Sequence, residues 1–462
     1  MDDRTQIVPG NSPALQPTVM GGATVMGGGA TQMGLGRTQM GIDPMRTQMG
    51  ASMETLEVAV LSGNKYAYWQ GSPRNHALVT LKSGGQQLGR RAPLNICLAI
   101  DRSGSMEGEP LEYVKRACEH VVDMLEPNDI LSIVAFEENV DVLMPARKVV
   151  NKPLVKEHIR RLYVGNTTNI YDGMMAACLQ VSTVMSQAQG YVHRVLLLTD
   201  GEPTSGLRDY NSIVQQVSEQ KQKGISITAL GFGSDYNEEL MSGIARRSGG
   251  NYYYIQRPDL IPEVFRSELQ QLMSIVAKNV RVRLHLSKWV NFRQVYGLQP
   301  STSNRMVEVS VPDIERGTIR TVLAEFDFEK HAQGEYRVAK IEVLYDDIAN
   351  NRPVQGQYDC LYEFTQDRGL IQSNYQPVVQ TELEIAQASM NLQRTMMGMR
   401  TQQMTAMGAM SELERTRTML LQAGRAGQAQ EVTLALQSIQ QGSADVEKTI
   451  MGTIYNLDQG KR

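Results

Sequence analysis

Apolar residues in the central part of the chain fall into short runs separated by amphipathic segments. Four runs between Leu94 and Ser274 have the length and the bounding turn residues of buried strands: NICLAID, ILSIVAF, VLLLTD and SITALGFG. Segments 110–125 and 171–186, which lie between them, have the apolar spacing of helices. Buried strands that alternate with helices predict βαβ units. The expected fold class is therefore α/β, with a doubly wound and mostly parallel sheet.

Apolar and polar residues alternate at period two on both sides of this region. LEVAVLSG and HALVTLKSG come before it, and NVRVRLHL, MVEVSV, TIRTVLAEFDF and YRVAKIEVLYDD follow the helical segment 262–275. Such alternation is typical of strands with one buried face. We expect these strands to form one β-sandwich into which the α/β domain, residues 92–275, is inserted. Residues 54–91 would supply the first strands of the sandwich and residues 276–375 the remainder.

The two ends of the chain differ from the middle in composition. Residues 1–53 are rich in Gly, Met, Thr and Gln and poor in aromatic residues. That composition cannot bury enough apolar surface to offset the entropy of ordering, so we expect a disordered tail. Residues 376–462 are rich in Gln, Met and Ala and contain few helix breakers, which predicts a C-terminal region of two or three helices.

Charge and composition exclude some functions. The chain has 46 Lys and Arg against 49 Asp and Glu, so its bulk charge gives no reason to expect binding to nucleic acid or to a membrane. Its N-terminus lacks the apolar segment of a signal peptide, and no run approaches the roughly 18 apolar residues of a spanning helix. The four cysteines form no CxxC pair, which favours free thiols in a reducing compartment. We therefore expect a cytoplasmic location.

Oxygen-bearing side chains follow two of the apolar strand runs. DRSGS, residues 101–105, comes directly after NICLAI, and Asp200 ends VLLLTD. Thr168 lies in a third segment, GNTTNIYDG, just before a predicted helix. In α/β folds, ligands bind beyond the carboxyl ends of the strands. Carboxylate and hydroxyl oxygens gathered there are hard donors of the kind that Mg²⁺ prefers.

These segments resemble the metal-ion-dependent adhesion site of von Willebrand factor type A (VWA) domains. DRSGS, GNTTNIYDG and LLLTDG occur in the order of that family, and the resemblance covers the chain from Leu94 to about Ser274. It implies that the serines and the threonine bind the ion directly or through water, and that the aspartates bind largely through water. It also implies an open coordination position for a partner's carboxylate. The matching residues are Asp101, Ser103, Ser105, Thr168 and Asp200.

The resemblance implies a non-enzymatic adaptor that binds an Asp or Glu of a partner protein through Mg²⁺, with Mn²⁺ as a second choice. The flanking segments, including GGNYYYIQRPDLIPEVF, resemble bacterial cytoplasmic VWA proteins labelled calcium-activated chloride channel homologues. That label describes kinship, and we expect no channel function. Catalysis by Ser103 or Ser105 would need a nearby base, usually His, and no histidine lies in a recognisable triad sequence. Metal-assisted hydrolysis is therefore the weakest alternative.

A short threonine motif recurs in the N-terminal tail, as TVMG or TQMG, and in three places an arginine precedes the threonine. The repeat is either low-complexity filler or a set of phosphoacceptors, and it resembles segments that bacterial Ser/Thr kinases modify and forkhead-associated domains bind. Related pieces occur at Thr395, Thr401 and Thr449. A phosphothreonine scaffold with a structural VWA core is therefore the first alternative function. Its candidate phosphoacceptors are Thr5, Thr18, Thr24, Thr31, Thr38 and Thr47.

Overall fold

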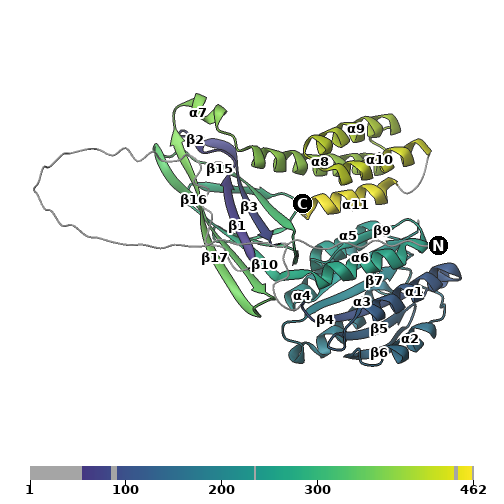
Figure 1. Ribbon diagram of the computed structural model, residues 1–462. Coiled ribbons are helices and arrows are strands. Elements are labelled where there is room, and N and C mark those ends of the chain that lie inside the picture. Colours follow the sequence, from purple (N-terminus) through teal and green to yellow (C-terminus); the bar gives the residue numbers. More distant parts are fainter. Residues whose placement is uncertain (1–54, 85–90, 234–235, 442–445, 460–462) are drawn as a thin grey trace, which may run out of the picture. The chain divides into compact units, whose positions relative to one another are not determined.

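The computed structural model describes residues 55–84, 91–233, 236–441 and 446–459. The predicted N-terminal tail and its six candidate phosphoacceptors lie outside these residues. Within them the chain forms an α/β part, a pair of β-sheets and a group of C-terminal helices (Figure 1).

The α/β part is built on a six-stranded sheet in the order β6-β5-β4-β7-β8-β9. All neighbouring strands are parallel except β6, which pairs antiparallel with β5 at one edge. Every residue of β4, β5 and β8 is buried, which explains their unbroken apolar sequences. The strands are β4 (Leu94–Asp101), β5 (Ile130–Phe136), β6 (Val140–Lys148), β7 (Val192–Thr199), β8 (Ser226–Phe232) and β9 (Tyr252–Ile255).

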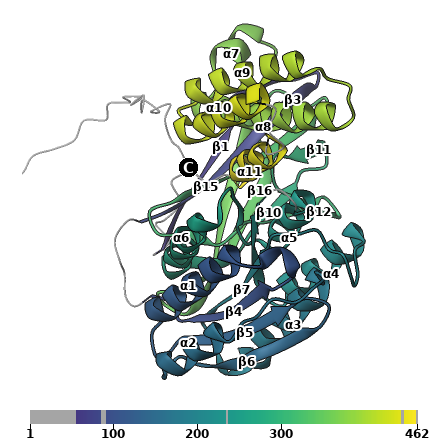
Figure 2. The same ribbon diagram turned by 90° about the vertical axis from the view of Figure 1, so that its right-hand side faces the viewer.

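Helices cover both faces of this sheet (Figure 2). Cys97 and Ala99 of β4 pack with α3, α4 and α5 on one face. Ile96 and Leu98, which alternate with them, pack with α1, α2 and α6 on the other face. The helices are α1 (Glu109–Met124), α2 (Lys152–Arg160), α3 (Ile170–Thr183), α4 (Tyr210–Gln222), α5 (Glu238–Ser248) and α6 (Ile261–Met273), with short 3₁₀ turns at η1 (Gly104–Met106), η2 (Met185–Gln187) and η3 (Pro258–Leu260).

Strands from both sides of the α/β part pair with one another. In the first sheet, β1 (Leu56–Ser62) and β3 (Ser72–Ser83) precede the α/β part, whereas β15 (Ile319–Phe328) and β11 (Val290–Val295) follow it. The second sheet has the order β12-β13-β10-β16-β17-β2, and β14 pairs with β10. Its strands are β12 (Pro300–Ser303), β13 (Met306–Ser310), β10 (Ile275–Leu286), β16 (Gly334–Asp347), β17 (Arg352–Thr365), β2 (Tyr66–Tyr68) and β14 (Ile314–Glu315).

Apolar side chains of the two sheets form one shared core, which includes Val79 and Phe326 from the first sheet and Val282 and Ile341 from the second. Since β3 precedes the α/β part and pairs with β15, which follows it, the α/β part is an insertion in this sandwich. The predicted fold class is thus confirmed.

Among its described residues the C-terminal region forms four helices after the short α7 (Arg368–Ser373), so the prediction of two or three helices was too low. The chain turns at Gly424, whose φ of 73° is a left-handed conformation that glycine adopts readily, and this turn separates two of the helices. Apolar residues of these helices belong to the same buried cluster as α3, α4 and α5. The helices are α8 (Pro377–Arg400), α9 (Ala406–Gln422), α10 (Ala426–Gln441) and α11 (Val446–Asp458).

Candidate metal centre

The carboxyl ends of two neighbouring strands bring the two candidate aspartates together. Asp101 is the last residue of β4, and Asp200 directly follows the last residue of β7. These strands are parallel neighbours in which Ile100 lies opposite Leu198. Thr199, the last residue of β7, donates a hydrogen bond from its hydroxyl to Asp101 Oδ2. Both carboxylates therefore lie at one edge of the sheet, as the sequence predicts.

The two serines connect these carboxylates. Ser105 Oγ donates a hydrogen bond of 2.7 Å to Asp200 Oδ1, and Ser103 Oγ lies 3.2 Å from Ser105 Oγ. The backbone N–H of Ser103 donates to Asp101 Oδ1 at 2.9 Å. Four of the five predicted residues thus form one continuous hydrogen-bonded chain.

Thr168 reaches the same place from the loop before α3. A Cβ atom built on Gly201 would lie 3.5 Å from Thr168 Oγ1 and 3.8 Å from Ser105 Oγ. Both hydroxyl oxygens therefore border the space that the missing side chain of Gly201 leaves open. Thr204 holds this loop in place, because its Oγ1 accepts from the backbone N–H of Thr168 at 2.9 Å. The structure thus brings all five predicted residues together.

Arg102, which the sequence analysis did not single out, connects the loops around the site. Its guanidinium is almost fully buried, lies 2.6 Å from Asp141 Oδ2 and 3.6 Å from Glu137 Oε1, and stacks over the Tyr163 ring at 4.5 Å. Its carbonyl accepts from the backbone N–H of Gly165 at 2.6 Å. The loop after β4 is therefore tied to β6 and to the loop that carries Thr168. Only the position of Arg102 within DRSGS could have drawn attention to it.

Burial dominates the electrostatics of the site. It raises the pKa of Asp101 to about 7, against hydrogen bonds from Thr199 and Ser103 that lower it, and the negative charge of Asp200 raises it further. A carboxylate in water-poor surroundings favours its protonated form unless a positive charge is near. A bound cation would supply that charge to both aspartates.

The residues present fit a small divalent cation. The five residues supply two carboxylates and three hydroxyls, and the hydroxyls of Ser105 and Thr168 border the space beside Gly201. All of these groups are hard oxygen donors, the type that suits Mg²⁺ or Mn²⁺. In the described part of the chain, no cluster of three or more His, Cys, Asp or Glu side chains could hold a metal. This centre differs from such clusters because most of its donors are hydroxyls.

Two of the three C-terminal relatives of the tail motif lie in helix interiors. Thr395 of α8 and Thr449 of α11 are buried, while Thr401 is exposed and its hydroxyl donates to the carbonyl of Met397. Buried threonines are not accessible to a kinase in the folded chain. The recurrence at the C-terminus therefore gives little support to phosphorylation of the tail.

The cysteines and the helices bear on the expected location. All four cysteines are buried free thiols. Among the described residues, no helix combines the length and the apolar character needed to cross a bilayer. The cytoplasmic location stays a prediction.

Comparisons with known proteins single out the α/β part. Residues 95–267, which include all five candidate ligands, match the family model of the von Willebrand factor type A domain. The chain is 28% identical to protein sll0103 of Synechocystis sp. over 66% of its own length and 72% of that protein's length. It is 31% identical to YfbK of Escherichia coli over 44% of its own length, but spans only 35% of YfbK.

One solved structure shares the fold well beyond the α/β part. A von Willebrand factor type A protein from Catenulispora acidiphila superposes with a TM-score of 0.68 over 82% of this chain and 89% of that chain, at 17% identity. At this identity the likeness shows the fold alone. The closer kinship with chloride channel homologues that the flanking segments suggest stays a prediction.

Proposed function

Since residues 95–267 form a VWA domain, a type of domain that serves in protein interactions, we propose that this chain is a metal-dependent adaptor. In this proposal Asp101, Ser103, Ser105, Thr168 and Asp200 hold a Mg²⁺ ion. When bound, the ion would supply a coordination position for an Asp or Glu carboxylate of a partner protein. The observation that carries the proposal is the convergence of these five side chains at the carboxyl ends of β4 and β7.

Some residues of the site would bind the ion, and others orient the residues that bind it. The hydroxyls of Ser103, Ser105 and Thr168 are neutral donors and add no negative charge. If the two aspartates bind largely through water, as the resemblance implies, the ion would keep enough positive charge to attract a further carboxylate from outside. Hydrogen bonds from Thr199 and from the Ser103 backbone fix the orientation of Asp101.

A binding role is favoured over a catalytic one. A serine nucleophile needs a base within hydrogen-bond reach, usually a histidine. The hydrogen bonds described for the hydroxyls of Ser103 and Ser105 join them to each other and to Asp200. These bonds suit ligands that are held in place, and we infer that the site does not perform hydrolysis.

The proposal is tested by affinity capture of partners from a lysate of the source cells, in Mg²⁺ and in EDTA. We expect a specific partner that is lost in EDTA and lost when the bait carries Asp101→Ala. A control bait with Asp123→Ala, which removes an exposed carboxylate at the end of α1 that pairs with Lys156, should retain it. If every specific partner survives both EDTA and Asp101→Ala, the metal bridge is wrong.

The capture experiment also distinguishes the adaptor from the alternative function, a phosphothreonine scaffold, if a phosphatase-treated sample is added. The threonine repeats of the tail favour that alternative. Binding by a forkhead-associated domain would be lost after phosphatase treatment and would not respond to EDTA. In the adaptor account, phosphorylation of the tail by a Ser/Thr kinase would add regulation to the metal site.

A further inference from the structure

A second polar hollow lies at the opposite ends of the strands from the candidate metal centre. It opens at the amino ends of β7 and β8, where β10 of the sandwich passes, and its volume is about 280 Å³. We call it the lysine pocket. The side chains of interest in its wall are those of His193, Lys221, Lys223, Lys278, Asn279 and Asp313.

Positive charge exceeds negative charge around the lysine pocket. Lys221 and Lys223 come from the end of α4, and Lys278 comes from β10. Arg194, buried next to them on β7, adds a fourth cation and pairs with Asp313 at 3.1 Å. The carboxylates that act on Lys221 and Lys278 are those of Asp313 and Asp346. Three lysines therefore line the pocket beside one carboxylate, that of Asp313, while Arg194 and Asp346 lie near the lysines outside the lining.

Part of this positive charge lacks hydrogen-bond partners. Arg194 Nε and Nη1 are buried and, among the described residues, meet no acceptor. Lys278 Nζ donates to the carbonyl of Tyr191 at 2.8 Å, and Lys221 Nζ lies 3.4 Å from Ser226 Oγ. An ammonium group has three donors, and these bonds use one on each lysine. The lysines in the pocket wall thus offer unused donors as well as charge.

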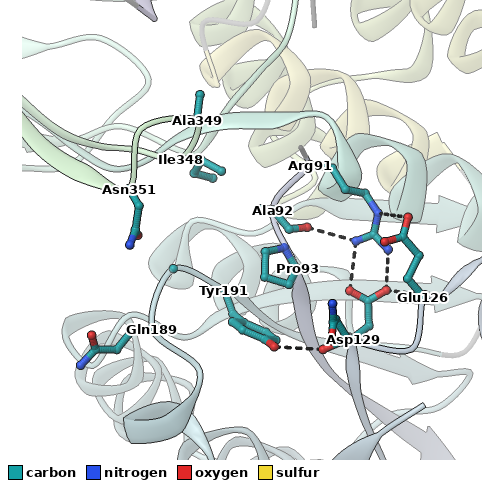
Figure 3. Close-up of a pocket in the computed structure, with 12 residues that line it drawn as sticks. Arg91, Ala92, Pro93, Glu126, Asp129, Gln189, Tyr191, Ile348, Ala349 and Asn351 are labelled. Atoms are coloured by element: carbon teal, nitrogen blue, oxygen red, sulfur yellow. Dashed lines mark hydrogen bonds and ion pairs between the residues drawn. The ribbon is translucent and has the colours of Figure 1, made fainter. Parts of the chain in front are cut away.

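In the neighbouring pocket, carboxylates of the protein pair with the positively charged side chain (Figure 3). This pocket has a volume of about 900 Å³ and shares Gly190 and Tyr191 with the lysine pocket. Its arginine, Arg91, forms two hydrogen bonds with Asp129, of 2.6 and 3.0 Å, and a third with Glu126. The positive charge of that pocket is balanced by protein carboxylates, whereas the charge of the lysine pocket is not.

An ordinary structural role fully explains only two of these four cations. Cations at a helix C-terminus are favoured by the helix dipole, which accounts for Lys221 and Lys223 at the end of α4. It does not account for Lys278, which comes from a strand, and the pair with Asp313 uses only part of the Arg194 guanidinium. Burial lowers the pKa of Lys221 and of Lys278, so keeping both ammonium groups charged at this place is unfavourable without an anion.

We propose that the lysine pocket binds a phosphate group, carried by a small phosphorylated molecule or by a phosphothreonine. A phosphate has close to two negative charges and three acceptor oxygens, which match an excess of cations with unused donors. A carboxylate would bring one charge and two oxygens. The volume holds a phosphate with a short attachment. This site uses none of the residues of the metal centre, so it goes beyond the proposed function.

The test is calorimetric titration of the full chain with inorganic phosphate. A second titration uses the phosphorylated form of peptide RTQMG, residues 37–41, with its unphosphorylated form as a control. The variants are Lys221→Gln with Lys278→Gln, and separately Lys223→Glu, an exposed position where charge reversal leaves the core intact. Lys148→Gln, an exposed lysine on the edge strand β6, is the matched control.

We expect saturable binding of phosphate, of the phosphopeptide or of both, weakened at least tenfold in both lysine variants and unchanged in Lys148→Gln. Tighter binding of the phosphopeptide would identify a phosphothreonine as the source, and equal or tighter binding of inorganic phosphate would identify a small molecule. The proposal is overturned if neither probe binds the wild type, or if the exposed Lys223→Glu variant binds both probes as the wild type does. Asp101→Ala should bind phosphate normally, so this test is independent of the metal site.

Discussion

Gly201 shows how the absence of a side chain shapes the candidate metal centre. The oxygens of Ser105 and Thr168 border the space where its Cβ would lie, at distances of 3.8 and 3.5 Å. These distances are ordinary contacts, so a methyl group would fit there without a clash. It would nevertheless occupy space that an ion and its water ligands need.

We therefore predict that Gly201→Ala separates folding from metal binding. The free energy of unfolding should change by less than about 1 kcal/mol, because no backbone strain or overlap arises. The affinity for Mg²⁺ should fall at least tenfold. Urea unfolding and calorimetry on the same variant measure both, with Gly427→Ala, where nothing lies within 4 Å, as control. Unchanged Mg²⁺ affinity would show that the ion does not occupy this space.

The five candidate ligands could be predicted because the DRSGS, Thr168 and Asp200 segments flank easily recognised elements and together resemble the adhesion site of VWA domains. Arg102 could not. Its role depends on Asp141 of β6, a strand whose mixed buried and exposed pattern gave no clear signal. The partners of a buried charge are set by tertiary contacts, which a single sequence does not display.

At the scale of elements, α11 links three parts of the chain. Asp458, its last residue, is buried and pairs with Arg246 of α5 at 2.6 Å, and Ser389 of α8 donates to its other oxygen at 2.5 Å. Tyr455 of the same helix donates to the carbonyl of Gly250, just before β9. The C-terminal helices are thus attached to the VWA domain by specific polar contacts as well as by apolar packing.

Removing the carboxylate of Asp458 should therefore be costly. We predict that Asp458→Ala lowers the free energy of unfolding by about 2–4 kcal/mol, because Arg246 loses its partner in a mostly buried position. The control Asp123→Ala breaks an exposed pair with Lys156 and should cost less than about 1 kcal/mol. Equal effects of the two substitutions in urea unfolding would show that α11 is not anchored through this pair.

The strands were not all equally predictable from the sequence. The buried apolar runs of β4, β5, β7 and β8 and the alternating runs of β10 and β16 were predicted from their patterns. The long strand β17 was missed although its buried residues alternate, because Gln, Asp and Gly interrupt the apolar signal in QGQYDC. Short β2, β12 and β14 have too few residues to show a period and form only through their pairing partners.

At the scale of the whole molecule, the inserted arrangement gives the chain two separate polar sites on one sheet. The candidate metal centre lies at the carboxyl ends of β4 and β7, and the lysine pocket lies at the amino ends of β7 and β8. The sequence predicted the first site because a local motif carries it. It could not predict the second, because Lys278 joins the cluster only through the position of the sandwich.

Calorimetric titration of Mg²⁺ into the full chain, with Asp101→Ala and Asp123→Ala beside the wild type, tests the central claim most directly. The account predicts one saturable site in the wild type and in Asp123→Ala, and loss of that site in Asp101→Ala while its unfolding remains cooperative. Mg²⁺ binding of equal affinity in all three proteins would contradict the account, because the ion would then bind somewhere other than beside Gly201.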